Sequence, residues 1–181
     1  SVTDEEMRAF LTRVYKAAGG ETDCTVEYKF DGLTVCLTYR DGEFVRATTR
    51  GNGAVGEDVT AQVLTIHSYP MRISYRGTLE VRGEAVIRLS VLDAYNRTAK
   101  EPLKNARNAA AGAIRNLDPK ITAERRPDIY FYDVNYLSEG KSLSQTEAHD
   151  FLLREGFRVF PYFRVCRTEE EVLAAIDEVE V

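Results

Sequence analysis

Residues 33–50 read Leu-Thr-Val-Cys-Leu-Thr-Tyr-Arg-Asp-Gly-Glu-Phe-Val-Arg-Ala-Thr-Thr-Arg. The runs on either side of Asp41-Gly42 are rich in β-branched and aromatic residues, and Asp-Gly between two such runs is a strong signal for a β-hairpin. The sequence therefore predicts two antiparallel strands at 33–40 and 43–50. A further strand is predicted over 25–30, directly before them.

Hydrophobic periodicity predicts the remaining elements on both sides of this hairpin. Helices are expected at 3–18, 58–64, 90–98, 107–114 and 144–155, and from residue 168 onward; strands are expected at 78–87, 128–136 and 157–165. Strands interrupted by helices, without strict βαβ alternation, indicate an α+β fold with a largely antiparallel sheet and flanking helices. We expect an N-terminal helix at 1–20 that leads into one domain at 21–181.

The composition is that of an ordinary globular protein. Of the 181 residues, 44% are hydrophobic and 29% are charged, which argues against disorder. No apolar run is long enough to span a bilayer, and the N-terminus lacks the features of a signal peptide. The three cysteines form no CxxC pattern, so neither a zinc site nor a disulfide framework is expected. These features favour a reducing, cytoplasmic location and no bound structural metal.

The charge is unevenly distributed along the chain. The net charge is −5, yet segment 97–126 holds eight basic and three acidic residues, a net charge of +5. A basic segment in an acidic chain is typical of a phosphate-binding face, although an ordinary solvated surface has the same composition.

The segment Glu27-Tyr28-Lys29-Phe30-Asp31-Gly32 carries the candidate chemistry. Residues two apart in a strand share a face, so Glu27, Lys29 and Asp31 are expected to project together. A row of surface ion pairs explains this pattern without any function. The alternative is a nucleophilic lysine, which requires surroundings that favour its uncharged form.

Two further segments have both a structural and a functional interpretation. Gly51, Gly53 and Gly56 match GxGxxG, but the parallel βαβ succession of a Rossmann fold is not predicted after them. In the strand at 78–87, the face opposite the apolar residues carries Glu80, Arg82 and Glu84. That face is typical of a strand at the edge of a sheet guarded by charge, or of a ligand-contacting surface.

These residues resemble the adenylation (nucleotidyltransferase) domain of bacterial NAD-dependent DNA ligases. Lys29-x-Asp31-Gly32 is similar to the nucleotidyl-transfer signature that polynucleotide ligases share with capping enzymes. Further segments resemble that ligase family's motifs: Thr49–Thr60 (TRGNGAVGEDVT), Leu79–Glu84 (LEVRGE), Asn105–Gly112 (NARNAAAG) and Ile114–Pro119 (IRNLDP). Asn52, Ala106 and Asn116 depart from the usual Asp, Pro and Gln, while the charged positions remain.

The resemblance implies a mechanism and a set of site residues. Lys29 is the implied nucleophile toward NAD⁺, with Asp31 assisting at the reacting centre or on Mg²⁺. The implied contacts are Glu27 with the adenine, Arg50 and Glu84 with ribose or phosphate, and Arg107 and Arg115 with phosphate or nicked DNA. The implied protein is a monomer that acts on nicked double-stranded DNA and binds no membrane.

Some segments of the family are not found in residues 1–181. The later DGVVIK strand, the module that captures nicotinamide mononucleotide, and the oligonucleotide-binding, zinc and helix-hairpin-helix modules have no counterpart here. We therefore expect these residues alone to self-adenylate slowly and not to seal nicks. Two other functions remain open from the sequence: an ATP-using polynucleotide ligase, and a non-catalytic module that binds adenine nucleotides or nicks.

Overall fold

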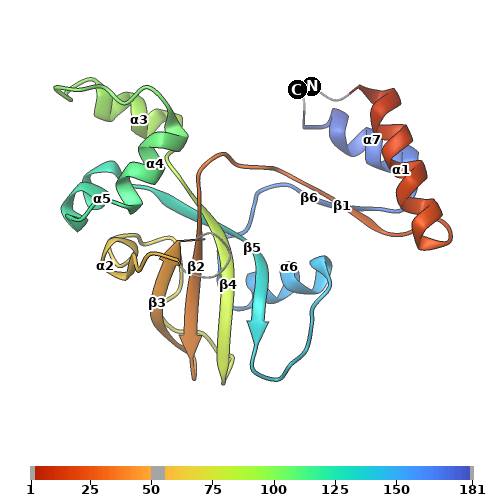
Figure 1. Cartoon of the computed structure of the whole chain (residues 1–181), viewed down its shortest axis with the longest axis horizontal. Helices are drawn as coiled ribbons and strands as arrows, with labels where there is room; N and C mark the ends of the chain where they lie inside the picture. The colour runs from red at the N-terminus through yellow and green to blue at the C-terminus, as the bar shows by residue number, and fades with distance from the viewer. Residues whose placement is uncertain (1–2, 50–55, 180–181) are drawn as a thin grey trace. The chain divides into compact units, whose positions relative to one another are not determined.

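The computed structural model describes residues 3–49 and 56–179 of the chain. The chain forms two compact units. The first unit combines Ser1–Lys29 with Phe160–Val181, and the second contains Phe30–Val159. Each unit has its own sheet and its own hydrophobic cluster (Figure 1).

Helix α1 (Asp4–Ala18) opens the first unit and has the predicted start and stop signals. The side chain of Thr3 accepts a hydrogen bond from the backbone N–H of Glu6, and the Glu6 side chain accepts one from the backbone N–H of Thr3. This capping box satisfies two backbone donors that the first turn leaves free. The helix ends at Gly19, whose left-handed conformation suits glycine.

The second half of the first unit comes from the other end of the sequence. Strand β1 (Cys24–Glu27) pairs antiparallel with β6 (Phe163–Cys166), and helix α7 (Glu169–Asp177) follows with a capping box between Thr168 and Glu171. The buried cluster that joins these elements to α1 consists of Leu11, Tyr162, Cys166, Val172 and Ala175.

The second unit is built on a four-stranded antiparallel sheet in the order β3-β2-β4-β5. Its strands are β2 (Leu33–Arg40), β3 (Glu43–Thr49), β4 (Thr78–Val86) and β5 (Asp128–Leu137). The predicted hairpin is confirmed: Asp41 and Gly42 have φ of 48° and 85°, the conformation of a turn that matches the strand twist. The expected α+β fold with antiparallel sheets is therefore confirmed.

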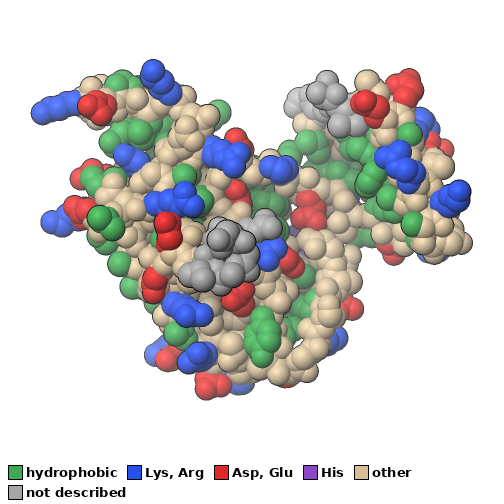
Figure 2. All heavy atoms as spheres, in the orientation of Figure 1, with side chains coloured by type: hydrophobic (Ala, Val, Ile, Leu, Met, Phe, Trp, Pro, Cys, Tyr) green, Lys and Arg blue, Asp and Glu red, His purple; other side chains and the backbone are tan. Residues whose placement is uncertain are grey.

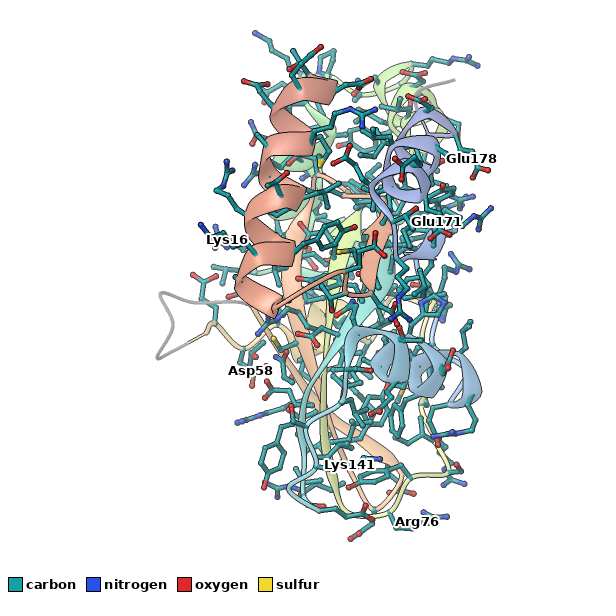
Figure 3. The ribbon with its side chains drawn as sticks, turned by 90° about the vertical axis from the view of Figure 1, so that its right-hand side faces the viewer. Lys16, Asp58, Arg76, Lys141, Glu171 and Glu178 are labelled. Carbon is teal, nitrogen blue, oxygen red and sulfur yellow. The ribbon has the colours of Figure 1, made fainter. Side chains whose placement is uncertain are left out.

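The core of the second unit lies against one face of this sheet. Burial alternates along β4 as the sequence predicts, with Leu79, Val81, Gly83 and Ala85 buried. Helix α6 (Gln145–Arg154) packs against β5 (Figure 3). It contributes Phe151 and Leu152 to the same cluster. The rings of Phe131 and Phe157 lie 4.9 Å apart within it.

A buried carboxylate fixes the end of α6 to the segment before β4. Glu155 is 9% exposed, and its carboxylate accepts hydrogen bonds from the N–H and the hydroxyl of Ser74 at 2.7 Å and from the N–H of Tyr75 at 3.3 Å. These three donors offset the cost of burying its charge.

The remaining helices are α2 (Thr60–Val63), α3 (Leu89–Asn96), α4 (Ala106–Ile114) and α5 (Pro119–Arg125). Small side chains allow α4 to pack closely, in a cluster of Ile87, Leu92, Ala109, Ala110 and Ala113. Within residues 3–49 and 56–179, no helix has the length and apolar character needed to cross a membrane.

A strand near the C-terminal end of the second unit and a helix between α4 and β5 differ from the sequence prediction. The strand expected at 157–165 is confined to β6, because the chain leaves the second unit after Val159 and Pro161 provides no N–H for a sheet. Helix α5 was not predicted, although its start carries a recognisable signal. Asp118 caps the helix by accepting from the N–H of Lys120, and Pro119 occupies the first helical position.

We expect Phe131→Ala to lower the free energy of unfolding by about 3–5 kcal/mol, because removing a fully buried ring leaves a cavity. Leu117→Ala is the control, since Leu117 is 97% exposed and its truncation should change stability by less than about 0.5 kcal/mol. Urea unfolding followed by circular dichroism measures both. Equal losses for the two variants would contradict the assignment of this core.

Candidate active site

The segment that carries the candidate nucleophile is not a continuous strand. Strand β1 ends at Glu27, and residues 28–32 form the connection to β2. The prediction that Lys29 and Asp31 share a strand face with Glu27 is therefore wrong. The pairing stops because β6 contributes its last partner, Phe163, opposite Glu27.

Glu27 and Lys29 belong to the first unit. Glu27 is half-buried at the end of β1, whereas Lys29 is exposed. Between them, the ring of Tyr28 packs against Tyr162 with centroids 5.5 Å apart and an interplanar angle of 54°. An aromatic contact thus fixes the backbone directly before a lysine that remains accessible.

Gly32 lies in the second unit, directly against the backbone of β4. A Cβ atom at this position would lie 2.0 Å from the carbonyl oxygen of Ala85. The N–H of Gly32 donates to Oε1 of Glu84 at 3.2 Å, and the hydroxyl of Thr34 donates to Oε2 at 3.0 Å. Both oxygens of Glu84 therefore hold the segment between the lysine and β2.

Asp31 and Arg107 are brought together from positions 76 residues apart. The guanidinium of Arg107 donates to Oδ1 of Asp31 at 3.1 Å, and their side chains are 61% and 65% exposed. Arg107 is held in the first turn of α4 by its cap, since the Asn105 side chain accepts from the N–H groups of Arg107 and Asn108. The pair is an accessible combination of one cation and one carboxylate.

Arg115, directly after α4, makes a second exposed ion pair. Its Nε lies 3.1 Å from Oε2 of Glu57, with side chains 51% and 66% exposed. Glu57 was not predicted as a site residue. Its backbone N–H donates to the hydroxyl of Thr49, and its carbonyl accepts from the N–H of Thr49. This pair of hydrogen bonds closes the two ends of the glycine-rich loop.

The glycine-rich loop is described only at its end. Arg50 and residues 51–55 lie outside the described residues, so the predicted contact from Arg50 stays a prediction. A Cβ on Gly56 would lie 2.0 Å from the carbonyl oxygen of Thr49, so this glycine is required by close approach. The strands around the loop are antiparallel, which contradicts the Rossmann alternative.

The face of the sheet opposite the core is polar. Strand β4 lies between β2 and β5. Its charged side chains are therefore not at a sheet edge, and the interpretation of this face as an edge strand guarded by charge is wrong. Glu80 accepts from Nδ2 of Asn135 at 3.0 Å, and Arg82 pairs with Asp133 at 3.5 Å. Burial raises the pKa of Tyr132, and the charge of Glu84 adds to this effect. These β5 partners were not predictable from spacing along the sequence, because they depend on which strands pair.

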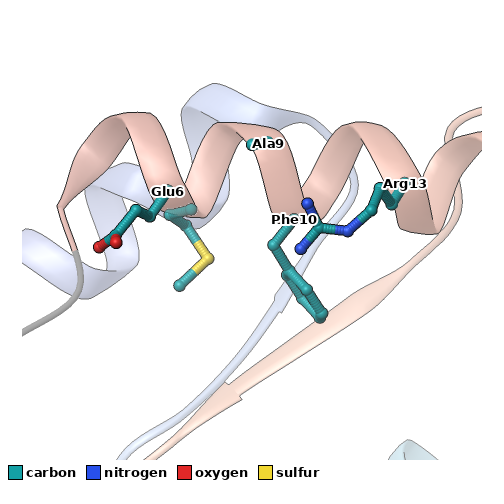
Figure 4. A pocket seen from close by; sticks show the side chains of 5 residues that line it. Glu6, Ala9, Phe10 and Arg13 are labelled. Carbon is teal, nitrogen blue, oxygen red and sulfur yellow. The ribbon is translucent and has the colours of Figure 1, made fainter.

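The described residues form no preassembled metal centre. No group of three or more His, Cys, Asp or Glu side chains in residues 3–49 and 56–179 is arranged to hold a metal ion. A hollow of about 560 Å³ lies along α1 between Glu6, Phe10 and Arg13, and none of the predicted site residues lines it (Figure 4). Basic side chains are scattered over the region of α3, α4 and α5, with acidic side chains among them (Figure 2).

A sequence profile of the NAD-dependent DNA ligase adenylation domain matches residues 1–181. The chain belongs to this family. It is 45% identical over 180 residues to the DNA ligase of Alkaliphilus metalliredigens and 53% identical over 154 residues to that of Finegoldia magna. It is 41% identical over 180 residues to the DNA ligase of Bacillus subtilis. These alignments cover 98%, 85% and 97% of this chain.

The chain spans about a quarter of the length of these relatives, namely 27%, 23% and 27%. Within this part, the adenylation domain joins segments that are distant in sequence. Glu84 of the LEVRGE strand binds the segment at Gly32, and Arg107 of the NARNAAAG helix binds Asp31. The structure thus brings together Asp31, Glu84 and Arg107 within the second unit.

We expect Gly32→Ala to lower the free energy of unfolding of the second unit by about 1–3 kcal/mol, because the new methyl group collides with the backbone of β4. Gly112→Ala is the matched control: its Cβ would meet only the flexible end of Arg125, at 3.0 Å, and alanine favours a helix. Chemical denaturation compares the two. A Gly32→Ala variant as stable as Gly112→Ala would show that the close approach is not needed.

Proposed function

We propose that Lys29 is the residue that becomes adenylated. Its Nζ attacks the α-phosphorus of NAD⁺, a nitrogen–phosphorus bond forms, and the bond to nicotinamide mononucleotide breaks. In ligases of the relatives' length, the adenylate then passes to the 5′-phosphate at a nick. The neighbouring 3′-hydroxyl finally displaces AMP and seals the strand.

The observation that carries this proposal is the hydrogen bonding of Glu84. Its carboxylate joins the nucleotidyl-transfer segment to the LEVRGE strand through Gly32 and Thr34. Two motifs that the sequence only suggested are connected by direct contacts within the second unit. These contacts hold Gly32, which follows Lys29 by three residues in the sequence. In phosphoryl transfer the protein contributes mainly geometry and electrostatics, so a direct link between the two motifs supports a shared role in binding the nucleotide.

The remaining residues are assigned roles by their chemistry. Glu27 accepts a hydrogen bond from the adenine amino group. Glu84 also accepts one from ribose, since each carboxylate oxygen has a second lone pair. Arg50 contacts ribose or phosphate.

Asp31 and Arg107 act at the reacting phosphate, and Arg115 at a phosphate of the substrate or of nicked DNA. The ion pairs of both arginines are more than half exposed, so they contribute little to stability and a phosphate can replace the carboxylate partner.

Mg²⁺ is proposed only as a counter-ion of the phosphates. Mg²⁺ usually keeps several of its waters and binds through one or two carboxylates together with substrate phosphates, so it needs no dedicated set of protein ligands. Asp31 is an exposed carboxylate in the segment after Lys29 and is assigned this role. Nicked double-stranded DNA as partner, a monomeric state and a cytoplasmic location are proposed from the family.

We expect Lys29→Ala to abolish the AMP adduct without loss of the fold, because the side chain is exposed and supports no core. Lys16→Ala, at an exposed lysine of α1, is the matched control and should retain the adduct (Figure 3). Intact-mass spectrometry after incubation with NAD⁺ or with ATP measures the outcome. An adduct on another lysine would overturn the assignment, and an adduct formed only from ATP would overturn the choice of substrate.

Glu27→Gln should weaken binding of AMP by about 1.5–3 kcal/mol, because it removes a charge-assisted hydrogen bond while preserving shape. Glu21→Gln, at an exposed position in the same unit, should leave the affinity unchanged. Isothermal titration calorimetry measures both. Equal affinity for the Glu27 variant and the parent would remove Glu27 from the site.

A further inference from the structure

Cys24 and Cys166 face each other across the two-stranded sheet of the first unit. The antiparallel register of β1 and β6 pairs Cys24 directly with Cys166. Partners in such a register project to the same side of the sheet. Both cysteines are free thiols in the structure.

The register satisfies the distance requirement of a disulfide. Directly opposed residues in antiparallel strands have Cα atoms about 4.5–5.5 Å apart, within the range of about 4.4–6.8 Å that disulfides span. Cys24 also packs against the buried cluster that contains Cys166. A disulfide between Cys24 and Cys166 would therefore join two residues that are already neighbours, and the pairing of β1 with β6 would not change.

Each of the two sulfur atoms makes a weak contact with a backbone carbonyl oxygen. Cys24 Sγ lies 3.7 Å from the carbonyl oxygen of Thr22, and Cys166 Sγ lies 3.5 Å from that of Glu171. Thiols are weak donors, so these contacts are readily exchanged. Residues Leu11 and Val172 complete an apolar surrounding in which a disulfide needs no polar partner.

The two thiols differ in access. Cys24 is half-buried, whereas Cys166 is only 4% exposed. Burial raises the pKa of the Cys166 thiol, with the charge of Glu171 and that of Cys24 adding to it. An external oxidant therefore reaches Cys24 first, and Cys166 is the residue placed to resolve the intermediate.

We propose that Cys24 and Cys166 form a reversible cross-strand disulfide in response to a small-molecule disulfide such as oxidised glutathione. The Cys24 thiolate attacks one sulfur of the oxidant and releases one glutathione thiolate. The Cys166 thiolate then attacks the Cys24 sulfur and releases the second. The protein loses two protons and two electrons, and the oxidant is reduced to two thiols.

The disulfide would cross-link the first unit, which combines two segments that are distant in the sequence. It would connect β1 covalently to β6. Without the bond, four residue pairs hold these two strands together, the last of them at Glu27. A two-stranded sheet is weak by itself, and a cross-link that closes a long loop opposes its opening. Intracellular disulfides are usually of this transient, redox-sensing kind.

Cys36 provides the internal control. It lies on β2 in the second unit, and its partners in the sheet are Thr48 and Arg82 rather than a cysteine. Burial and the charge of Glu80 raise the pKa of its thiol. Cys36 should therefore remain reduced while the other two cysteines pair.

The test is to equilibrate the 181-residue chain in mixtures of reduced and oxidised glutathione, block free thiols, and map the peptides under non-reducing conditions. We expect a peptide pair linking Cys24 to Cys166 in the monomer, with a mass about 2 Da below the sum of the two peptides. Amide exchange in β1 and β6 should slow by about tenfold or more on oxidation. Cys36→Ser should leave both results unchanged.

Cys24→Ser is the decisive variant, because its half-buried position tolerates the change, and it should abolish the linked peptide. Cys166→Ala should do the same. Glutathione retained on Cys24 at equilibrium without the Cys166 link would overturn the proposal. So would a disulfide that includes Cys36, a link between two chains, or three persistent thiols in the most oxidising mixture.

Discussion

Gly32 lies so close to β4 that only a glycine can occupy its position without displacing the strand. The contact fixes where the chain enters the four-stranded sheet, and the carboxylate of Glu84 secures it from the side. Once the backbone is held here, the position of Asp31 follows, and Arg107 reaches it from α4. The close packing of Gly32 that the fold requires thus also determines where Asp31 of the candidate site lies.

Two exposed ion pairs in the second unit stabilise the position of Asp31 and of the segment at Glu57. The two arginines at the ends of α4 each pair with an acid from another segment, Asp31 or Glu57, and all four side chains are more than half exposed. In contrast, the carboxylate of Glu155 is buried and fully engaged by Ser74 and Tyr75. The buried carboxylate serves the fold, whereas the exposed pairs keep their charges available to a phosphate.

The features that were predictable from the sequence are those that depend on local patterns. Alternation along β4, the Asp41-Gly42 turn and the capping box at Thr3 each follow from residues near one another. Strand order and side-chain pairing do not. The contact between Asp31 and Arg107 depends on where α4 packs, and the partners of Glu80 and Arg82 on β5 depend on which strands become neighbours. Spacing along the sequence determines neither. The end of β1 at Glu27 likewise depends on the length of its distant partner, β6.

The division of the first unit between two distant segments has a consequence for the order of folding during synthesis. Within these residues, α1 and β1 are synthesised before the second unit, but the strand that pairs with β1 is made only after the whole second unit. Contacts between distant positions form late, because the intervening loop must be closed first. The second unit can therefore become compact while α1 still exposes the apolar side chains of its inner face. During this interval the apolar side of α1 lacks the cover that α7 provides in the folded unit, which is the kind of exposure that makes partly folded chains prone to aggregation.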